Sequence, residues 1–257
     1  LAQYLGLARA ECAEQNFVGE TLVVATRALA AEIETALGFA IAPPSVFDGL
    51  YGLTVGDRVL DGRDIQALYA ALRVIEASGL SAPRICEIGG GFGKVARYAL
   101  LRGARHYTIV DLPTVSAMQY FFLSRALPET RIAFRDPADA AGESGVDLVF
   151  APLVDASAKI AADIVINCDS FPEMGDKVCR GYFEKIGRWA PLLVSINQEA
   201  NRKVGDSGER QSVVGDLLPD YGFTRRYRFR SWIRRGYVEE LWSAPAASDS
   251  RNNNPSP

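Results

Sequence analysis

The pattern of hydrophobic and polar positions changes near residue 84. Before this point, apolar residues recur at helical spacing. The stretch from Glu20 to Leu37 is rich in Ala, Leu and Glu, and Gly38 is a suitable helix stop. After a break at Pro43-Pro44, Asp61 can cap a second helix. The apolar stripe of this second helix is Ile65, Leu68, Leu72 and Ile75. The first 80 residues are therefore predicted to form a helical addition.

From residue 84 onward, short apolar runs alternate with helical segments. The main strands are predicted at 85–88, 106–110, 146–150, 163–167 and 192–196. Helices are expected at 94–101, 114–127, 172–189 and 211–218. Residues 131–134 form a candidate short extra strand. Such alternation predicts a parallel sheet with helices on both faces.

The last two predicted strands, 223–232 and 236–242, have no helix between them, so they should pair as an antiparallel hairpin. The fold class is therefore α/β. We expect a Rossmann-like, doubly wound, seven-stranded sheet with an antiparallel edge hairpin and an N-terminal helical addition. The predicted units are a helical segment or lid at 1–80, a ligand-binding domain at 81–244 and a disordered tail at 245–257.

Composition narrows the function classes. The formal net charge is -3 and no strongly basic stretch occurs, which disfavours nucleic-acid binding. The short runs Arg225-Arg226 and Arg234-Arg235 are interpreted as solvated faces. One histidine and no closely spaced cysteine pair argue against a zinc site. No apolar run is long enough to span a membrane, and reduced thiols favour a cytoplasmic protein.

The strongest chemical signal is the glycine loop that follows the first main strand, Glu87-Ile-Gly-Gly-Gly-Phe-Gly93. A dinucleotide G-x-G-x-x-G pattern fails from Gly89, because Lys94 takes its last position. From Gly91 the pattern ends on Ala96, but it begins two residues too late for the strand. The register that fits the strand is E-x-G-x-G-x-G, which is typical of S-adenosylmethionine binding in class I methyltransferases.

An acidic residue stands at the end of the next strand. Asp111 is placed to accept hydrogen bonds from ribose hydroxyls. Glu87 can attract the positively charged amino-acid end of the cofactor. The full set of predicted cofactor-binding residues is Glu87, Gly89, Gly90, Gly91, Asp111, Leu112, Asn167 and Cys168. The alternatives are a nicotinamide-binding domain or a glycine turn without a ligand.

Several segments together resemble the family of sugar O-methyltransferases. They are Ile85-Cys-Glu-Ile-Gly-Gly-Gly-Phe-Gly93, Tyr107-Thr-Ile-Val-Asp-Leu-Pro113, Asp163-Ile-Val-Ile-Asn-Cys-Asp-Ser-Phe-Pro-Glu-Met174, Ser195-Ile-Asn-Gln-Glu199 and Trp232-Ile-Arg-Arg-Gly-Tyr-Val-Glu-Glu-Leu241. The resemblance covers roughly residues 50–242. It implies S-adenosylmethionine as the methyl donor and a sugar-bearing acceptor. Cys168 stands where the family leads us to expect Thr.

Candidate catalytic residues follow the fourth and fifth strands, because ligands bind beyond the carboxyl ends of a doubly wound sheet. Asp169 is a candidate general base for the acceptor hydroxyl, with cofactor orientation or helix capping as the alternative. Glu199 is the second catalytic candidate. Asp169, Asn197 and Glu199 also offer oxygen ligands for Mg²⁺, with substrate hydrogen bonding as the plainer alternative.

Other polar residues have structural interpretations. Ser170-x-x-Glu173 is typical of a capping box. His106 begins its strand and should lie at the edge of the sheet opposite the site. Tyr237 and Glu239 should share one face of the last strand, with Glu240 on the other. The N-terminal segment, including Tyr51, is a candidate lid.

The sequence thus predicts methyl transfer from S-adenosylmethionine to a hydroxyl of a small, sugar-containing metabolite. The alternatives are N- or C-methylation of another small metabolite, or a non-catalytic S-adenosylmethionine-binding partner protein. The expected partners are a small-molecule substrate and a second copy in a homodimer, with neither nucleic acid nor membrane.

Overall fold

A computed structural model describes residues 28, 31–41, 44, 46, 53–55, 58–60, 62–199, 212–231, 233–234 and 236–245. The predicted cap Asp61, the lid residue Tyr51 and nearly all of the predicted tail lie outside this set. Residues 31–37 are helical, as the composition of this stretch predicts. None of the helices in the described residues has the length and apolar character needed to cross a membrane.

The described residues form one eight-stranded sheet with the order β5-β6-β4-β3-β7-β8-β10-β9, and a separate two-stranded pair, β1 and β2. The bounds are β1 Leu53–Val55, β2 Arg58–Leu60, β3 Arg84–Ile88, β4 His106–Asp111, β5 Ile132–Phe134, β6 Gly145–Phe150, β7 Ile164–Cys168, β8 Leu192–Gln198, β9 Thr224–Arg230 and β10 Tyr237–Ser243. The predicted count of seven was therefore wrong by one. The short run 131–134 does form a strand, β5, which pairs in parallel with β6 at the edge.

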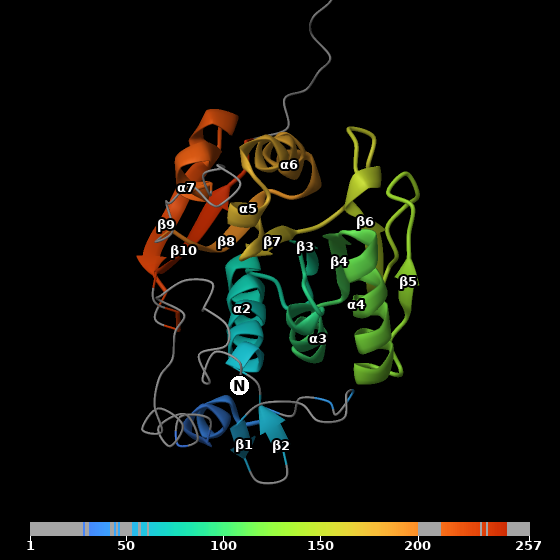
Figure 1. The fold of residues 1–257 in the computed structure, drawn as a ribbon, viewed down its shortest axis with the longest axis vertical. Helices are drawn as coiled ribbons and strands as arrows, with labels where there is room; N and C mark the ends of the chain where they lie inside the picture. The colour runs from blue at the N-terminus through green and yellow to red at the C-terminus, as the bar shows by residue number, and fades with distance from the viewer. Residues whose placement is uncertain are drawn as a thin grey trace, which may run out of the picture.

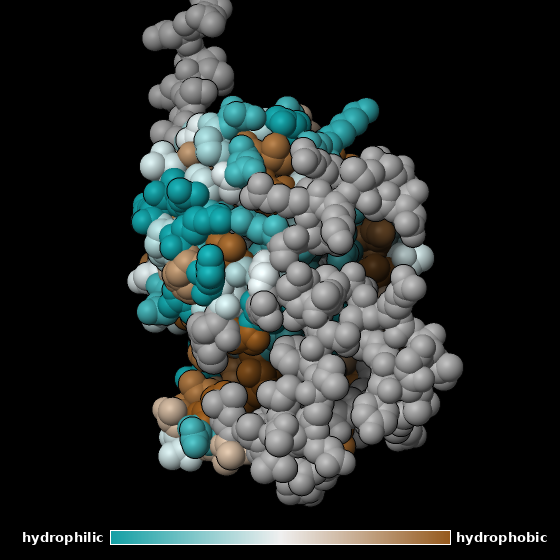
Figure 2. Space-filling view, turned by 60° about the vertical axis from the view of Figure 1, so that its left-hand side comes forward, coloured by the Kyte–Doolittle hydropathy of each residue, from teal (hydrophilic) through white to brown (hydrophobic). Residues whose placement is uncertain are grey.

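The predicted antiparallel hairpin is confirmed. β10 lies between β8 and β9 and runs antiparallel to both, while the other pairs in the large sheet are parallel. β9 is the edge strand, and most of its side chains are exposed. Figure 2 looks toward the hairpin side of the molecule, where hydrophilic residues predominate over the upper part of the view.

Helices cover both faces of the sheet (Figure 1). The helices are α2 Gly62–Ser78, α3 Lys94–Leu101, α4 Pro113–Ala126, α5 Ser170–Glu173, α6 Asp176–Trp189 and α7 Val214–Leu217, with the short 3-10 turns η2 Ala151–Leu153 and η3 Leu218–Tyr221. Residues of α2, α3 and α4 share one buried hydrophobic cluster, and α5, α6 and η3 contribute to a second. The doubly wound Rossmann-like arrangement is thereby confirmed.

The helix α2 belongs to the core of the sheet, although it precedes the first main strand. Ala67, Leu68, Ala71 and Val74 are at least 95% buried in the cluster that also contains α3. Where α2 meets β10, the buried side chain of Glu239 accepts hydrogen bonds from α2 and β9. Its donors are Tyr69 Oη, Arg73 Nε at 2.8 Å and Tyr227 Oη at 2.9 Å. The proposed boundary near residue 80 stays a prediction.

The single helix predicted at 172–189 is interrupted. Gly175 has φ 72°, a left-handed conformation that suits glycine, and it separates α5 from α6. The glycine precedes α6, where Asp176 lies in the first turn and favours the positive end of the helix dipole. The break leaves α5 as one short turn directly after β7.

Candidate active site

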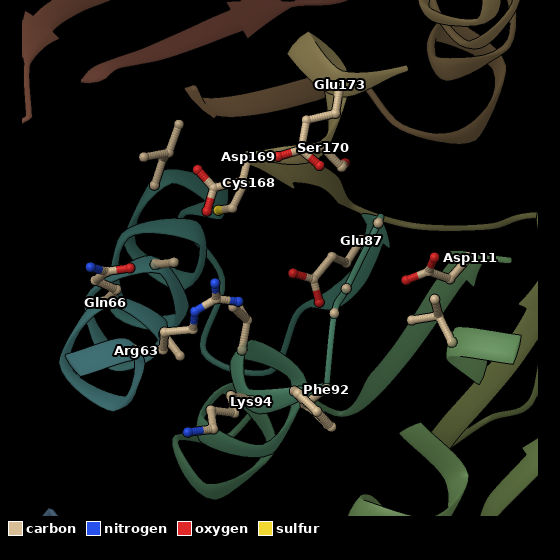
Figure 3. A pocket seen from close by; sticks show the side chains of 18 of the residues that line it. Arg63, Gln66, Glu87, Phe92, Lys94, Asp111, Cys168, Asp169, Ser170 and Glu173 are labelled. Atoms are coloured by element: carbon tan, nitrogen blue, oxygen red, sulfur yellow. The ribbon is translucent and has the colours of Figure 1, made fainter. Parts of the chain in front are cut away.

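A cavity of about 1040 Å³ opens at the carboxyl ends of β3, β4 and β7. The glycine loop, Asp111 and Asp169 line it, together with α2 and the turn between β9 and β10. Figure 3 shows the Glu87 carboxylate pointing into the cavity, with Arg63 and Gln66 of α2 along one side. The predicted location beyond the strand ends is therefore where the cavity lies, and its size suits a small-molecule site.

The glycine loop brings backbone to the cavity wall. At Gly89, which has φ 73°, an added Cβ would lie 2.2 Å from Ser170 Oγ. At Gly90, an added Cβ would lie 2.7 Å from Ile109 Cγ2 and 3.0 Å from Glu87 Oε2. The distances of 2.2 Å and 2.7 Å are too short for a real side chain. The loop therefore needs glycine at these positions, and its bare backbone can approach a ligand closely.

Glu87 is a buried carboxylate at the cavity. It is only 1% exposed, and the described residues give it one hydrogen bond, from Tyr107 Oη to Oε2 at 3.0 Å. The pKa of Glu87 is raised to about 8, mainly by burial. The hydrogen bond from Tyr107 lowers this pKa, and the nearby charge of Asp111 raises it. A cationic ligand in the cavity would relieve the cost of ionising this group.

Asp111 is positioned by its neighbours and by Gln119 of α4. Its Oδ1 accepts a hydrogen bond from the amide of Leu112 at 2.8 Å, and its Oδ2 accepts one from Gln119 Nε2 at 2.8 Å. Gln119 Nε2 also donates to the carbonyl of Gly91 at 2.9 Å, and so joins the loop to the acid. Burial raises the pKa of Asp111, while the bonds from Leu112, Gln119 and the loop amides lower it, leaving a net rise. Gln119 was not predicted from the sequence, where its only signal is its position on the helix that follows Asp111.

The other predicted cofactor contacts divide into two groups. Leu112 is 56% exposed and lines the cavity, as does Cys168. Asn167 is fully buried and does not line the cavity. Its Nδ2 donates to the carbonyl of Ile88 at 2.8 Å and to Ser170 Oγ at 2.5 Å, which ties β7 to β3. Cofactor contact by the Asn167 side chain remains a prediction that these bonds do not favour.

Asp169 lies at the cavity in an unusual backbone conformation. Its φ of 69° makes it the one non-glycine residue with positive φ among those described, a strain that concentrates at functional sites. Its carboxylate is paired with Arg234, whose Nη1 lies 2.8 Å from Oδ1 and 2.6 Å from Oδ2. Arg234 was interpreted from sequence as solvated, which is wrong: its side chain is 17% exposed and lines the cavity.

The side chains of Glu199 and Asn197 are held by partners other than Asp169. Arg228 grips Glu199 with two nitrogens, Nη1 at 2.8 Å from Oε1 and Nη2 at 2.6 Å from Oε2. The Nδ2 of Asn197 donates to Asn167 Oδ1 at 2.9 Å and to Ser195 Oγ at 2.8 Å. Neither residue lines the cavity. Within the described part of the chain, no group of three or more His, Cys, Asp or Glu is placed to hold a metal.

The structural interpretations of three other polar groups have mixed outcomes. His106 is fully buried at the start of β4, 3.4 Å from Asp147, away from the cavity as predicted. Tyr237 and Glu239 share a face, because both contact α2 or the cavity while Glu240 pairs with Arg228. The prediction of a capping box is wrong. Ser170 is the first residue of α5, and its hydroxyl donates to the carbonyl of Ile88 at 2.9 Å.

Comparisons with known proteins identify the fold. No family model and no curated protein matches the sequence. Among solved structures, magnesium protoporphyrin IX methyltransferase from Synechocystis PCC 6803 with bound S-adenosylhomocysteine has a TM-score of 0.53 and 14% identity, over 72% of this chain and 84% of that chain. An O-methyltransferase family protein from Burkholderia thailandensis has a TM-score of 0.50 and 16% identity, over 72% and 58%.

These identities are low, so the likeness establishes the fold alone. The resemblance to sugar O-methyltransferases stays a prediction, because no family model supports it. Together with the strand order and the two helix layers, the comparisons show that the chain has the Rossmann-like fold of class I S-adenosylmethionine-dependent methyltransferases.

Proposed function

We propose that this protein transfers a methyl group from S-adenosylmethionine to a hydroxyl of a small, sugar-containing metabolite. The observation that carries the proposal is the convergence of Glu87, Gly90 and Asp111 on one wall of the cavity and Asp169 on another. One wall suits the cofactor and the other offers a base. Magnesium protoporphyrin IX methyltransferase, which shares this fold, has been solved both with bound S-adenosylhomocysteine and with bound S-adenosylmethionine, and this supports the choice of cofactor.

The residues on the cofactor side fit S-adenosylmethionine. Gly89 and Gly90 line the cavity with backbone, because packed side chains leave no space for a Cβ at either position. Glu87 presents a buried carboxylate that needs a cation, and the cofactor carries both an ammonium and a sulfonium. Asp111 lies at the next strand end, held in place to accept hydrogen bonds from ribose hydroxyls. Arg63 lines the same cavity and is a suitable partner for the cofactor's carboxylate.

When bound, the cofactor supplies an electrophilic methyl group on a sulfonium sulfur. The protein must then align the acceptor hydroxyl and take its proton as the new bond forms. We assign proton removal to Asp169, because its strained backbone holds a carboxylate at the cavity. Glu199 is held by Arg228 outside the cavity, so its assignment as a second catalytic residue loses support.

A ligand-specific thermal shift tests the proposal. We expect S-adenosylhomocysteine at saturating concentration to raise Tm by several degrees, because it binds only the folded chain. NAD⁺ at the same concentration should leave Tm unchanged, since it is the ligand of the rejected dinucleotide pattern. A shift with NAD⁺ and none with S-adenosylhomocysteine would replace this proposal by the nicotinamide-binding alternative.

A further inference from the structure

The ion pair between Asp169 and Arg234 blocks the role proposed for Asp169. A carboxylate whose two oxygens both accept from one guanidinium is poorly placed to receive a further proton. The partners come from distant parts of the chain, β7 and the turn before β10. If Asp169 is the base, something must draw Arg234 away from it when the acceptor binds.

The geometry of this pair suits an exchange of partners. Arg234 uses a single nitrogen, Nη1, for both oxygens of Asp169. In contrast, Arg228 meets Glu199 with Nη1 and Nη2, the two-nitrogen fork that gives the stronger and more specific contact. Arg234 therefore does not make the stronger two-nitrogen contact with a carboxylate.

Arg234 also contacts Tyr237, independently of Asp169. Its guanidinium carbon lies 3.6 Å from the centre of the Tyr237 ring, and its Nη2 bonds to the Tyr237 hydroxyl. Stacking on an aromatic face is a favourable position for a guanidinium. The cation can therefore stay at the cavity wall while its anionic partner changes.

Glu173 lies on the same side of the cavity as Asp169, whereas Arg63 and Lys94 lie on the opposite side (Figure 3). The Nζ of Lys94 lies 3.1 Å from Asp64 of α2. Near Arg234 the lining includes apolar Ile196 and Ile233, and the Arg234 side chain is only 17% exposed. A partly buried guanidinium attracts an oxyanion more strongly than a fully solvated one does.

We infer that the acceptor carries an oxyanion, either a carboxylate or a phosphate, and that Arg234 binds this group and releases Asp169. This inference rests on the proposed function and names its substrate class, an acidic sugar derivative. Asp169 then accepts the hydroxyl proton while the acceptor oxygen bonds to the methyl carbon. The methyl–sulfur bond breaks, and sulfur keeps the electron pair as a neutral thioether.

Matched ligand pairs test the inference. Calorimetry on the protein saturated with S-adenosylhomocysteine would compare 4-nitrophenyl glucuronide with 4-nitrophenyl glucoside, and glucose 6-phosphate with glucose. We expect the anionic member of at least one pair to bind at least tenfold more tightly than its neutral partner. The pair that discriminates identifies a carboxylate or a phosphate as the recognised group.

Variants assign the preference to Arg234. In Arg234→Met the preference should fall to about one, and Arg234→Lys should keep part of it. Arg226→Met is the control, because it removes one positive charge from β9 at an exposed position outside the cavity. Equal binding within both pairs, no binding of either anion, or an unchanged preference in Arg234→Met would overturn the inference. If S-adenosylhomocysteine itself fails to bind the wild type, the proposed function has failed instead.

Discussion

The two sides of the cavity are held together in different ways. The cofactor side is built from neighbouring segments, in which Gly91, Asp111 and Gln119 are linked by hydrogen bonds across 28 residues or fewer. The acceptor side is assembled across the fold, since Asp169 and Arg234 are 65 positions apart. The helix α2, which precedes the first main strand, also lines the cavity and contributes Arg63.

The cofactor side is therefore a preorganised surface, whereas the acceptor side can rearrange. On the cofactor side, an added side chain would collide with packed atoms, and Asp111 already accepts bonds on both oxygens. On the acceptor side, a half-exposed carboxylate meets a cation through one nitrogen. Changes on the first side should therefore alter cofactor affinity, whereas changes on the second should alter turnover and substrate choice.

The largest effect is expected for Asp169→Asn. The amide cannot accept the hydroxyl proton, so kcat for release of S-adenosylhomocysteine should fall by about 10²-fold to 10⁴-fold. The Kd of S-adenosylhomocysteine should stay within about twofold, because the cofactor side is unchanged. Asp155→Asn is the matched control, since Asp155 is an exposed acid that does not line the cavity. Retention of full turnover would remove Asp169 as the base.

A second effect is expected for Gly90→Ala. The new methyl group would press on Ile109 and on the Glu87 carboxylate, so affinity for S-adenosylhomocysteine should fall at least tenfold. Gly181→Ala is the control, because it lies in α6 with its nearest neighbour, Lys185 Nζ, 3.7 Å from the added Cβ. Wild-type affinity in Gly90→Ala would mean that the ligand does not approach the loop.

The third effect concerns pH and Glu87. Because the pKa of Glu87 is about 8 in the free protein, a cationic ligand that needs the ionised form must displace a proton below that pH. The affinity for S-adenosylmethionine, which carries both an ammonium and a sulfonium, should therefore fall by about tenfold for each pH unit below 8, measured by calorimetry between pH 6 and 8. The same titration with Glu87→Gln should be much flatter. A flat wild-type profile would exclude Glu87 from ligand binding.

The last effect is on stability without ligand. The folded pKa of Glu87 lies above the unfolded value of 4.5, so its contribution is present at low pH and is lost as pH rises through about 8. Glu87→Gln removes this dependence. Its Tm relative to wild type should therefore increase by about ten degrees from pH 5 to pH 9, measured by thermal unfolding. A constant difference would show that burial does not penalise the charged form.

The comparison also explains what could be predicted from sequence. The glycine loop and Asp111 were found because strand, turn and acid follow one another within a short segment. The same locality made the parallel strands and the hairpin predictable. The eighth strand was uncertain because Ile132–Phe134 is short and only partly buried, so its periodicity carries little information.

The acceptor side could not be predicted in this way. Arg234 reads as one of several exposed arginines until the fold places its turn beside Asp169. Glu199 follows a strand on the correct side, yet Arg228 of β9, which is two strands away in the sheet, holds it outside the cavity. Ser170 has the capping-box spacing, but the carbonyl of Ile88 takes its hydroxyl. In each case a partner distant in sequence decided the outcome, and local spacing carries no information about such a partner.

We propose that the cavity binds S-adenosylmethionine between the glycine loop and Asp111. A calorimetric titration of wild type and Asp111→Ala with S-adenosylhomocysteine tests this binding most directly. We expect one site per chain in the wild type, and at least tenfold weaker binding in the variant because hydrogen bonds to a charged acceptor are lost. Absence of binding to the wild type, or equal affinity in the two proteins, would contradict it.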